Sequence, residues 1–250
     1  MSKLEAVSIT KSFGDNTILQ DVSLRLEPRE IVCLLGVSGG GKTTLFNVLS
    51  GLTLPDRGQV FLDGREITGK AGHISYMLQK DLLMPYRTVL DNIALPLIIK
   101  GAPKKEARRK ALEHFAEFGL SGTEKQYPAQ LSGGMRQRAA LIRTLALEPD
   151  LLLLDEPFSA LDYQTRLFVS DEIGSIIKNE NITAILVTHD ISEAVSMSDR
   201  VIVLTARPAS IKSIHNIVLT CDSDTPMRRR SAPEFKDYFN TIWRELDVHV

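Results

Sequence analysis

The sequence has few of the features that mark secreted or membrane-spanning proteins. Only two cysteines, Cys33 and Cys221, occur in 250 residues, which is too few for a disulfide framework and favours a reducing compartment. The longest apolar runs, such as LLLL at 151–154, fall far short of the roughly 18 residues that a membrane-spanning helix needs. The opening segment, MSKLEAVSITKSFGD, has no apolar stretch of the signal-peptide kind. We therefore expect a cytoplasmic protein that reaches a membrane only through a partner or a surface contact.

An excess of either charge sign is also absent. Lysine and arginine number 30 and aspartate and glutamate number 31, so the formal net charge is -1. This balance excludes a uniformly basic surface and argues against nucleic acid as a partner. Hydrophobic residues make up 43% of the chain, which is enough for one sizeable core or for a core with an attached subdomain.

The order of apolar patterns predicts an α/β fold. Near the start, LEAVSIT and TILQDVSLRL alternate as the strands of a small antiparallel sheet do. Continuous apolar runs in EIVCLLG, LLLLDEP and TAILVTHD then predict buried parallel strands. In the region between, the period is helical, with Leu112, Phe115 and Phe118 on one face. We expect a core over about 1–84 and 148–205, which consists of a parallel sheet and an N-terminal antiparallel β subdomain. An all-helical subdomain would be inserted over about 85–147, and a C-terminal extension would follow over 206–250.

A glycine-rich segment, GVSGGGKT, separates the first buried strand from a predicted helix. It matches G-x-x-x-x-G-K-[ST] in the context that this motif requires, which an accidental glycine-rich turn would not supply. Glycines let backbone N–H groups surround phosphate oxygens, and the positive end of the helix adds to the field. Lys42 would place a charge between the β- and γ-phosphates, and Thr43 would offer a hydroxyl to Mg²⁺. The predicted phosphate-binding residues are Gly36, Val37, Ser38, Gly39, Gly40, Gly41, Lys42 and Thr43. The apolar face of the helix would consist of Leu45, Val48, Leu49 and Leu52.

Two acidic residues, Asp155 and Glu156, end the second buried strand in LLLLDEP. The carboxylate of Asp155 can hold the Mg²⁺ shell, and Glu156 can polarise a water molecule in line with the γ-phosphate. Without the phosphate loop, two solvated acids at a strand end would be an equal alternative.

A second pair of glycines occurs in LSGGMRQR, before a predicted basic helix. Ser132, Gly133 and Gly134 would present a hydroxyl and backbone N–H groups at the start of that helix, which makes a second anion site. One chain cannot easily bring two such sites to one phosphate, whereas a twofold dimer can. A plain helix cap at Ser132 is the alternative, but it leaves the two glycines without a reason.

Together, GVSGGGKT, LSGGMRQR, LLLLDEPFSALD and VTHD resemble the nucleotide-binding subunit of an ATP-binding cassette (ABC) transporter. The resemblance covers about residues 4–205 in unbroken order. It implies an ATPase domain over 1–205 with the P-loop NTPase (RecA-like) fold, which uses ATP and Mg²⁺. In this family two cassettes pack head to tail, and the LSGG of one meets the γ-phosphate held by the other. A homodimer and a transmembrane permease are therefore the implied partners, at the cytoplasmic face of the membrane.

Four further positions take roles from this resemblance. Phe13 matches the aromatic residue that stacks on adenine, although the family more often has tyrosine there and an apolar core residue is the alternative. Gln79 matches the glutamine that reaches Mg²⁺ and the attacking water and borders the groove that meets the membrane subunit. His189, in VTHD, resembles the histidine that contacts the γ-phosphate, and Thr44 is expected to bind phosphate. The SALD segment, 159–162, looks like the loop that touches the opposite subunit.

One position departs from the family pattern. The residue after LSGG is usually glutamine, and here it is Met135, which lacks the hydrogen bonds of an amide. Methionine there, with LLMPYRTVLDNIALPL and ARP at 206–208, is similar to the cassettes of importers for nitrate, sulfonates, taurine and pyrimidine vitamin precursors. That subgroup often has tryptophan where this chain has Tyr86. The likeness implies uptake of a small solute, with an extracytoplasmic solute-binding protein as a further partner.

Three other interpretations remain open at this point. Within the family, the chain could belong to an exporter or a lipoprotein-release system. A soluble ABC ATPase of DNA repair or translation is less consistent with one cassette, no heptad run and a near-neutral charge. In the C-terminal extension, FKDYFNTIWREL predicts an amphipathic helix, which could make a regulatory contact, lie on a membrane surface, or pack on its own chain. Its apolar face would consist of Phe235, Phe239, Ile242 and Leu246, with Trp243 beside it.

Overall fold

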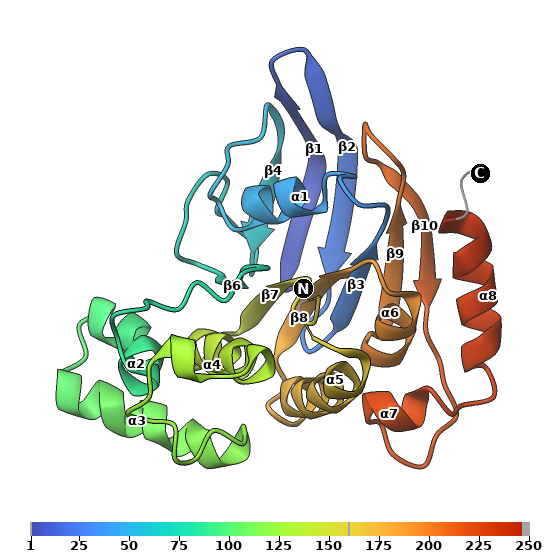
Figure 1. Cartoon of the computed structure of the whole chain (residues 1–250). Coiled ribbons are helices and arrows are strands. Elements are labelled where there is room, and N and C mark those ends of the chain that lie inside the picture. The colour runs from blue at the N-terminus through green and yellow to red at the C-terminus, as the bar shows by residue number, and fades with distance from the viewer. Residues whose placement is uncertain (1, 160, 247–250) are drawn as a thin grey trace.

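The computed structural model describes residues 2–159 and 161–246 and is built around a six-stranded sheet (Figure 1). The strand order is β10-β9-β3-β8-β7-β6. The first five strands along the chain pair in parallel, and β10 pairs antiparallel with β9. Every residue of β3, β7 and β8 is buried, as expected for strands covered on both faces. The strands are β3 (Ile31–Leu35), β6 (Ser75–Met77), β7 (Leu151–Asp155), β8 (Thr183–Thr188), β9 (Arg200–Leu204) and β10 (Ile211–Asn216).

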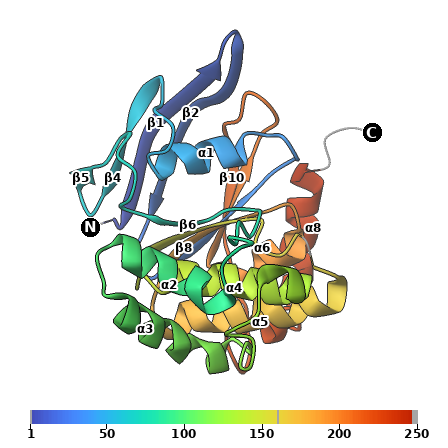
Figure 2. The same cartoon turned by 60° about the vertical axis from the view of Figure 1, so that its left-hand side comes forward.

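A separate antiparallel sheet, in the order β2-β1-β4-β5, forms the N-terminal part. Helix α1 (Lys42–Leu49) lies between the two sheets, as Figure 2 shows from the side. Its predicted apolar face is buried at Leu45, Val48 and Leu49. Leu52 was expected on the same face but is exposed, because α1 ends before it and the chain turns away after Gly51. The strands are β1 (Leu4–Phe13), β2 (Asn16–Leu26), β4 (Arg57–Leu62) and β5 (Arg65–Glu66).

The region between β6 and β7 is helical. The helices are α2 (Val89–Ile99), α3 (Lys104–Glu117), the short 3-10 helix η1 (Pro128–Gln130) and α4 (Gly133–Leu145). Phe115 and Phe118 are buried as predicted, but Leu112 is exposed. The buried stripe of α3 follows Ala107, Ala111 and Phe115 at a spacing of four, and Leu112 lies one position off that stripe.

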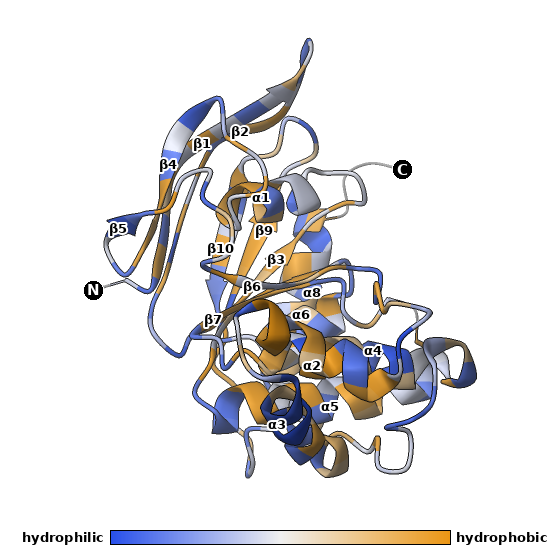
Figure 3. Cartoon of the chain, turned by 90° about the vertical axis from the view of Figure 1, so that its left-hand side faces the viewer, coloured by the Kyte–Doolittle hydropathy of each residue, from blue (hydrophilic) through white to orange (hydrophobic). Residues whose placement is uncertain are grey.

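The remaining helices cover the sheet and its edge. They are α5 (Tyr163–Asn179), α6 (Ile191–Met197), α7 (Pro226–Arg229) and α8 (Phe235–Leu246). Figure 3 shows that the apolar residues concentrate in the strands of the large sheet and on the inner sides of the helices. Helix α8 packs against α6 and β9 with Ile242 fully buried, which confirms the alternative that it packs on its own chain. Among the described residues, no helix combines the length and apolar character needed to cross a bilayer.

Candidate active site

The phosphate loop joins β3 to α1, at the edge where the parallel strands have their carboxyl ends. Gly41 caps α1 in a left-handed backbone conformation, with φ of 99°. A Cβ at Gly41 would lie 3.0 Å from Ile18 Cγ2 of β2, and a Cβ at Gly40 would lie 2.9 Å from the carbonyl oxygen of Val37. Glycine is therefore required at both positions. The N–H of Gly40 donates to the carbonyl oxygen of Val37 at 3.0 Å, which closes the turn of the loop.

The ammonium group of Lys42 is held inside the loop. Its Nζ donates to the carbonyl oxygens of Gly36 and Val37, both at 2.9 Å, and the side chain is buried. Burial lowers the pKa of Lys42, and the carboxylates of Glu156 and Asp155 act against that shift. A phosphate in the loop would offer this charge stronger acceptors than two carbonyl groups.

Asp155, the last residue of β7, faces the start of α1. Its Oδ2 accepts hydrogen bonds from Thr43 Oγ1 at 3.0 Å and from Tyr76 Oη at 3.2 Å. Burial raises the pKa of Asp155, while these two donors lower it. The pKa of Tyr76 is raised by burial and by the Asp155 charge, so its hydroxyl stays protonated and donating. Hard oxygen donors thus converge as Mg²⁺ prefers, and the residues fit that ion.

Glu156 brings together the ends of three neighbouring strands. Its Oε2 accepts from Gln79 Nε2 at 3.0 Å, and its Oε1 lies 3.5 Å from His189 Nδ1. These three residues, predicted separately from distant motifs, share one site. The backbone of Glu156 has a positive φ of 47°, which is uncommon for a residue with a side chain and is typical of functional positions. Tyr76 belongs to the same site but was missed, because nothing in SYM distinguishes it from any aromatic residue in a strand.

The segment Ser132–Gly134 lies apart from these residues. Ser132 caps α4, and its Oγ accepts from the Met135 N–H at 3.3 Å. A Cβ at Gly134 would lie 3.1 Å from Thr165 Cγ2, so close packing on α5 explains this glycine. Among the described residues, no hydrogen bond joins this segment to the phosphate loop, and α4 and α1 lie in different parts of the molecule (Figures 1 and 2). One copy of the chain therefore does not bring the two glycine segments together.

This combination of a phosphate loop, a buried aspartate, a clustered glutamate and a separate LSGG segment agrees with a comparison of sequences. The sequence model described as "ABC transporter" matches residues 19–159. The chain belongs to the ABC transporter family. It is an ATP-binding subunit and an ATPase, with the α/β fold of the P-loop NTPases.

Several ABC relatives are alike over most of their length. The chain is 45% identical over 231 residues to the uncharacterised ABC transporter ATP-binding protein YtlC of Bacillus subtilis, covering 92% of this chain and 89% of YtlC. It is 39% identical to the aliphatic sulfonates import protein SsuB of Bacillus licheniformis, covering 95% and 92% of the two chains. It is 44% identical to the formylaminopyrimidine import protein ThiZ of Halalkalibacterium halodurans, covering 82% and 79%.

A solved ABC structure is alike in fold. The dimeric cassette MJ0796 in a post-hydrolysis state, bound to ADP and Pi, superposes with a TM-score of 0.76 at 29% identity. The match covers 86% of this chain and 99% of that chain. Most of this chain therefore has a counterpart in a nucleotide-binding cassette.

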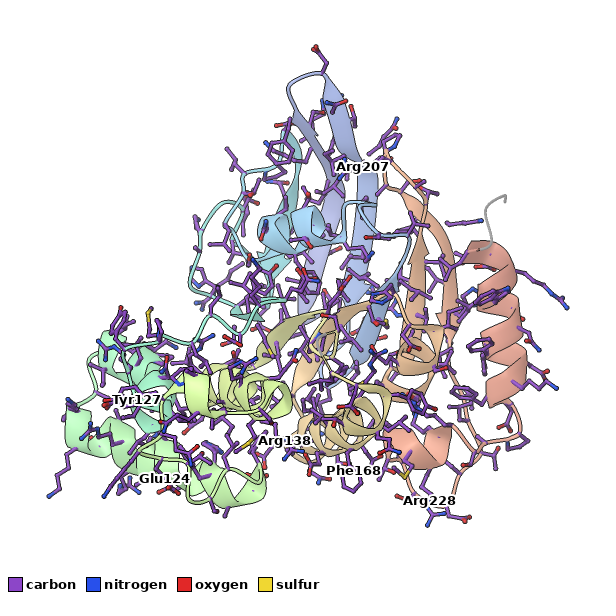
Figure 4. The ribbon with its side chains drawn as sticks, viewed as in Figure 1. Glu124, Tyr127, Arg138, Phe168, Arg207 and Arg228 are labelled. Atoms are coloured by element: carbon purple, nitrogen blue, oxygen red, sulfur yellow. The ribbon has the colours of Figure 1, made fainter. Side chains whose placement is uncertain are left out.

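The predicted adenine-binding residue, Phe13, belongs to the β1–β2 hairpin, and a cavity separates this hairpin from the turn that follows β9. Phe13 ends β1 with 54% of its surface exposed, so it is not the core residue that was the alternative, and Lys11 Nζ lies 5.4 Å from its ring centre. Arg207, labelled in Figure 4, donates from Nε to the carbonyl oxygen of Gly39. This contact was missed, because ARP served in the sequence only as a mark of a subgroup. A cavity of about 580 Å³ here is lined by Thr10, Asp15, Asn16, Thr17, Arg207 and Pro208 among others.

Ala160 of the SALD segment lies outside the described residues.

Proposed function

We propose that this chain is the ATP-hydrolysing subunit of an importer for a small solute. The observation that carries the hydrolytic part is Glu156, which is held between Gln79 and His189 beside the phosphate loop. The importer part is supported by relatives whose names state import of sulfonates or formylaminopyrimidine. Met135 and the ARP segment favour the same group.

Nucleotide binding uses the loop and its neighbours. The backbone N–H groups of residues 36–41 and of Thr44 surround the phosphates, and Lys42 exchanges its two carbonyl acceptors for phosphate oxygens. Phe13 stacks on the adenine ring. Thr43, Asp155 and Gln79 would hold Mg²⁺, which supplies positive charge to the phosphate oxygens when bound.

Hydrolysis requires a base beside the γ-phosphate. Glu156 accepts a proton from the attacking water as that water bonds to phosphorus, and the bond to ADP breaks. Gln79 donates to one carboxylate oxygen and orients it. His189 lies at the other carboxylate oxygen of Glu156. There it can contact the γ-phosphate and hold the side chain of Glu156 in place after it has taken up the proton.

A second copy completes the site. The dimeric structure of MJ0796 supports pairing of two copies. The family resemblance implies a head-to-tail pair, in which Ser132–Gly134 of one copy meets the γ-phosphate held by the other. The hydroxyl and the N–H groups at the start of α4 are an anion site that the chain cannot use on its own phosphate loop. ATP then stabilises the closed pair, and hydrolysis followed by phosphate release reopens it.

The permease contact lies next to Gln79. The segment after β6 exposes Leu78, Leu82 and Tyr86, the last at 72% of its surface. Helix α4 holds this segment: Arg136 Nε donates to Asp81 Oδ2 at 3.2 Å, and Arg143 Nη1 donates to the Leu82 carbonyl oxygen at 2.8 Å. Movement of the LSGG helix on closure would therefore shift the surface that a permease helix contacts. The subunit would sit peripherally at the cytoplasmic face of the membrane, and an extracytoplasmic solute-binding protein would deliver the cargo.

Reconstitution tests this proposal. The chain is coexpressed with the permease from its own gene cluster, purified from membranes and placed in liposomes with the cognate binding protein. We expect ATP-dependent movement of a sulfonate or a formylaminopyrimidine from the compartment opposite the cassette to the cassette side of the bilayer, and stimulation of ATPase by the loaded binding protein. Purification without any membrane partner, or transport of solute away from the cassette side of the bilayer into its exterior, would contradict the importer assignment.

A further inference from the structure

Helix α8 is anchored firmly by one face. Ile242 is fully buried, and Phe235, Tyr238, Phe239 and Leu246 pack, partly buried, against the same core. The carboxylate of Glu245 accepts from Ser213 Oγ and lies 3.0 Å from His215 Nε2, which ties the helix to β10. This face is already occupied by the chain itself, so it is not free to lie on a membrane.

At the border of this face, α8 carries an aromatic pair whose inner ring, Phe239, packs on the core and whose outer ring, Trp243, is exposed. Phe239 and Trp243 stack with ring centres 6.1 Å apart and an angle of 15° between their planes. Trp243 is the only tryptophan of the chain and keeps 54% of its surface exposed. A cavity of about 530 Å³ joins this pair to the phosphate loop at 36–38 and to the segment 189–192. The aromatic pair is thus continuous with the surface on which a second copy closes.

The surface that a second copy would bring there also carries an exposed aromatic residue. The close approach of Gly134 to Thr165 sets the start of α4 directly against the first turn of α5. Tyr163 lies in that turn with 70% of its surface exposed. If Ser132 meets the phosphate loop of another copy, this packing of α4 on α5 would carry Tyr163 into the same interface.

We propose that Phe239 and Trp243 form a contact site for Tyr163 of a second copy, made when ATP closes the dimer. This inference rests on the proposed head-to-tail dimer and extends its interface to the C-terminal helix. Aromatic pairs prefer such stacked or edge-on contacts. Replacing Trp243 with alanine should weaken ATP-dependent dimerisation about 5- to 160-fold, because a twofold dimer makes this contact twice and one aromatic pair corresponds to about 2- to 13-fold.

The single tryptophan allows a direct measurement. In a Glu156→Gln background, where bound ATP persists, we expect ATP to shift Trp243 emission to shorter wavelength as the dimer forms in gel filtration. A Ser132→Arg variant, which is expected to bind ATP without pairing, should show no shift. If its emission shifts equally, Trp243 responds to nucleotide in its own subunit and the proposal is overturned.

Disulfide trapping tests the pairing of residues. Tyr163→Cys is combined with Trp243→Cys in a Cys221→Ser background, since Cys33 is buried and burial raises the pKa of its thiol. We expect an intermolecular disulfide that requires ATP. Phe168→Cys with Trp243→Cys is the matched control, because Phe168 is also exposed on α5 but points about 140° away around the helix. Equal trapping in both pairs overturns the proposal.

The two hypotheses fail in different ways. If the Glu156→Gln protein stays monomeric with ATP, the proposed dimer fails and this contact fails with it. If that protein pairs with ATP while Trp243 emission stays constant and no disulfide forms, only the α8 contact is wrong.

Discussion

The side-chain amide of Gln79 donates to the carboxylate of Glu156 at 3.0 Å, although 77 positions separate the two residues. Gln79 follows β6 and Glu156 follows β7, and these two strands are parallel neighbours in the sheet. The hydrogen bond therefore exists because two strand ends meet at one edge. It leaves the other carboxylate oxygen facing His189 Nδ1 at 3.5 Å, so both oxygens have a fixed neighbour.

Replacing this carboxylate should separate ATP binding from hydrolysis. We expect Glu156→Gln to lower the ATPase rate about 10²- to 10⁴-fold, the range for losing a general base, because an amide cannot accept the proton. Binding of ATP should persist, since the phosphate loop is intact. Phosphate release and nucleotide retention on a filter measure the two properties, and the exposed Glu180→Gln is the control. Hydrolysis at the wild-type rate would show that Glu156 is not the base.

Much of this site could be predicted from sequence, because several motifs are local. The phosphate loop combines a strand, a glycine turn and a helix within a few residues, so Lys42 and Thr43 were placed by pattern alone. The contacts of Tyr76 and Arg207 depend on strand order: β6 lies beside β7, and β9 lies beside β3. A linear pattern does not contain that order.

Strand β10, which lies within the segment 206–250 that we expected to be an extension, was not predicted for a similar reason. In IKSIHN the isoleucines are three positions apart, which does not match the period of two expected for a strand. Pairing with β9 nevertheless makes it the edge strand of the sheet. Tertiary context thus decides a segment whose own signal is weak.

A charged, bulky residue in the LSGG segment should block pairing of two copies. We expect Ser132→Arg to abolish hydrolysis while leaving nucleotide binding to the monomer within about twofold of wild type, because within residues 2–159 and 161–246 no hydrogen bond joins this segment to the chain's own phosphate loop. Calorimetry with ATP and a phosphate-release assay measure the two effects. Ser231→Arg, at another exposed serine, is the control. If nucleotide binding is lost together with hydrolysis, Ser132 acts at the phosphate loop of its own chain, and the site shared by two copies is wrong.

The exposed ring at Phe13 should contribute to affinity rather than to fold. Stacking of a base on an aromatic ring contributes about 1–3 kcal/mol, so we expect Phe13→Ala to raise the Kd for ATP roughly 5- to 150-fold. Phe13→Tyr should keep wild-type affinity. Because 54% of the ring surface is exposed, the thermal unfolding temperature without nucleotide should change little. Titration calorimetry checks the affinities, and an unchanged Kd in Phe13→Ala would exclude the stacking role.

We expect Asp155 to make the folded protein less stable without nucleotide, while its proposed role is to hold Mg²⁺. Burial raises the pKa of this carboxyl, so the folded chain holds its proton more tightly than the unfolded chain does. Stability from this group is therefore present at acid pH and declines as pH rises from the ordinary value of 3.8 through the raised pKa. Asparagine removes the charge but keeps an oxygen that can accept from Thr43 and Tyr76. We expect Asp155→Asn to unfold at a higher temperature than wild type at pH 7 without nucleotide, by about 2–4 °C for each kcal/mol gained.

That gain should shrink as the pH falls through the raised pKa of the wild-type carboxyl toward the ordinary value of 3.8, because the wild-type group then takes up a proton. Bound MgATP should reverse the gain. Added MgATP stabilises the folded chain by an amount that grows with the logarithm of the ligand concentration over its Kd, and the variant lacks the carboxylate that would hold the ion. Calorimetric scans at several pH values, with and without MgATP, give both comparisons. Asp150→Asn is the control, because its side chain is exposed. An Asp155→Asn protein that is less stable than wild type at pH 7 would mean that the Asp155 charge stabilises the fold. If MgATP raises the unfolding temperature of variant and wild type equally, Asp155 does not hold the ion.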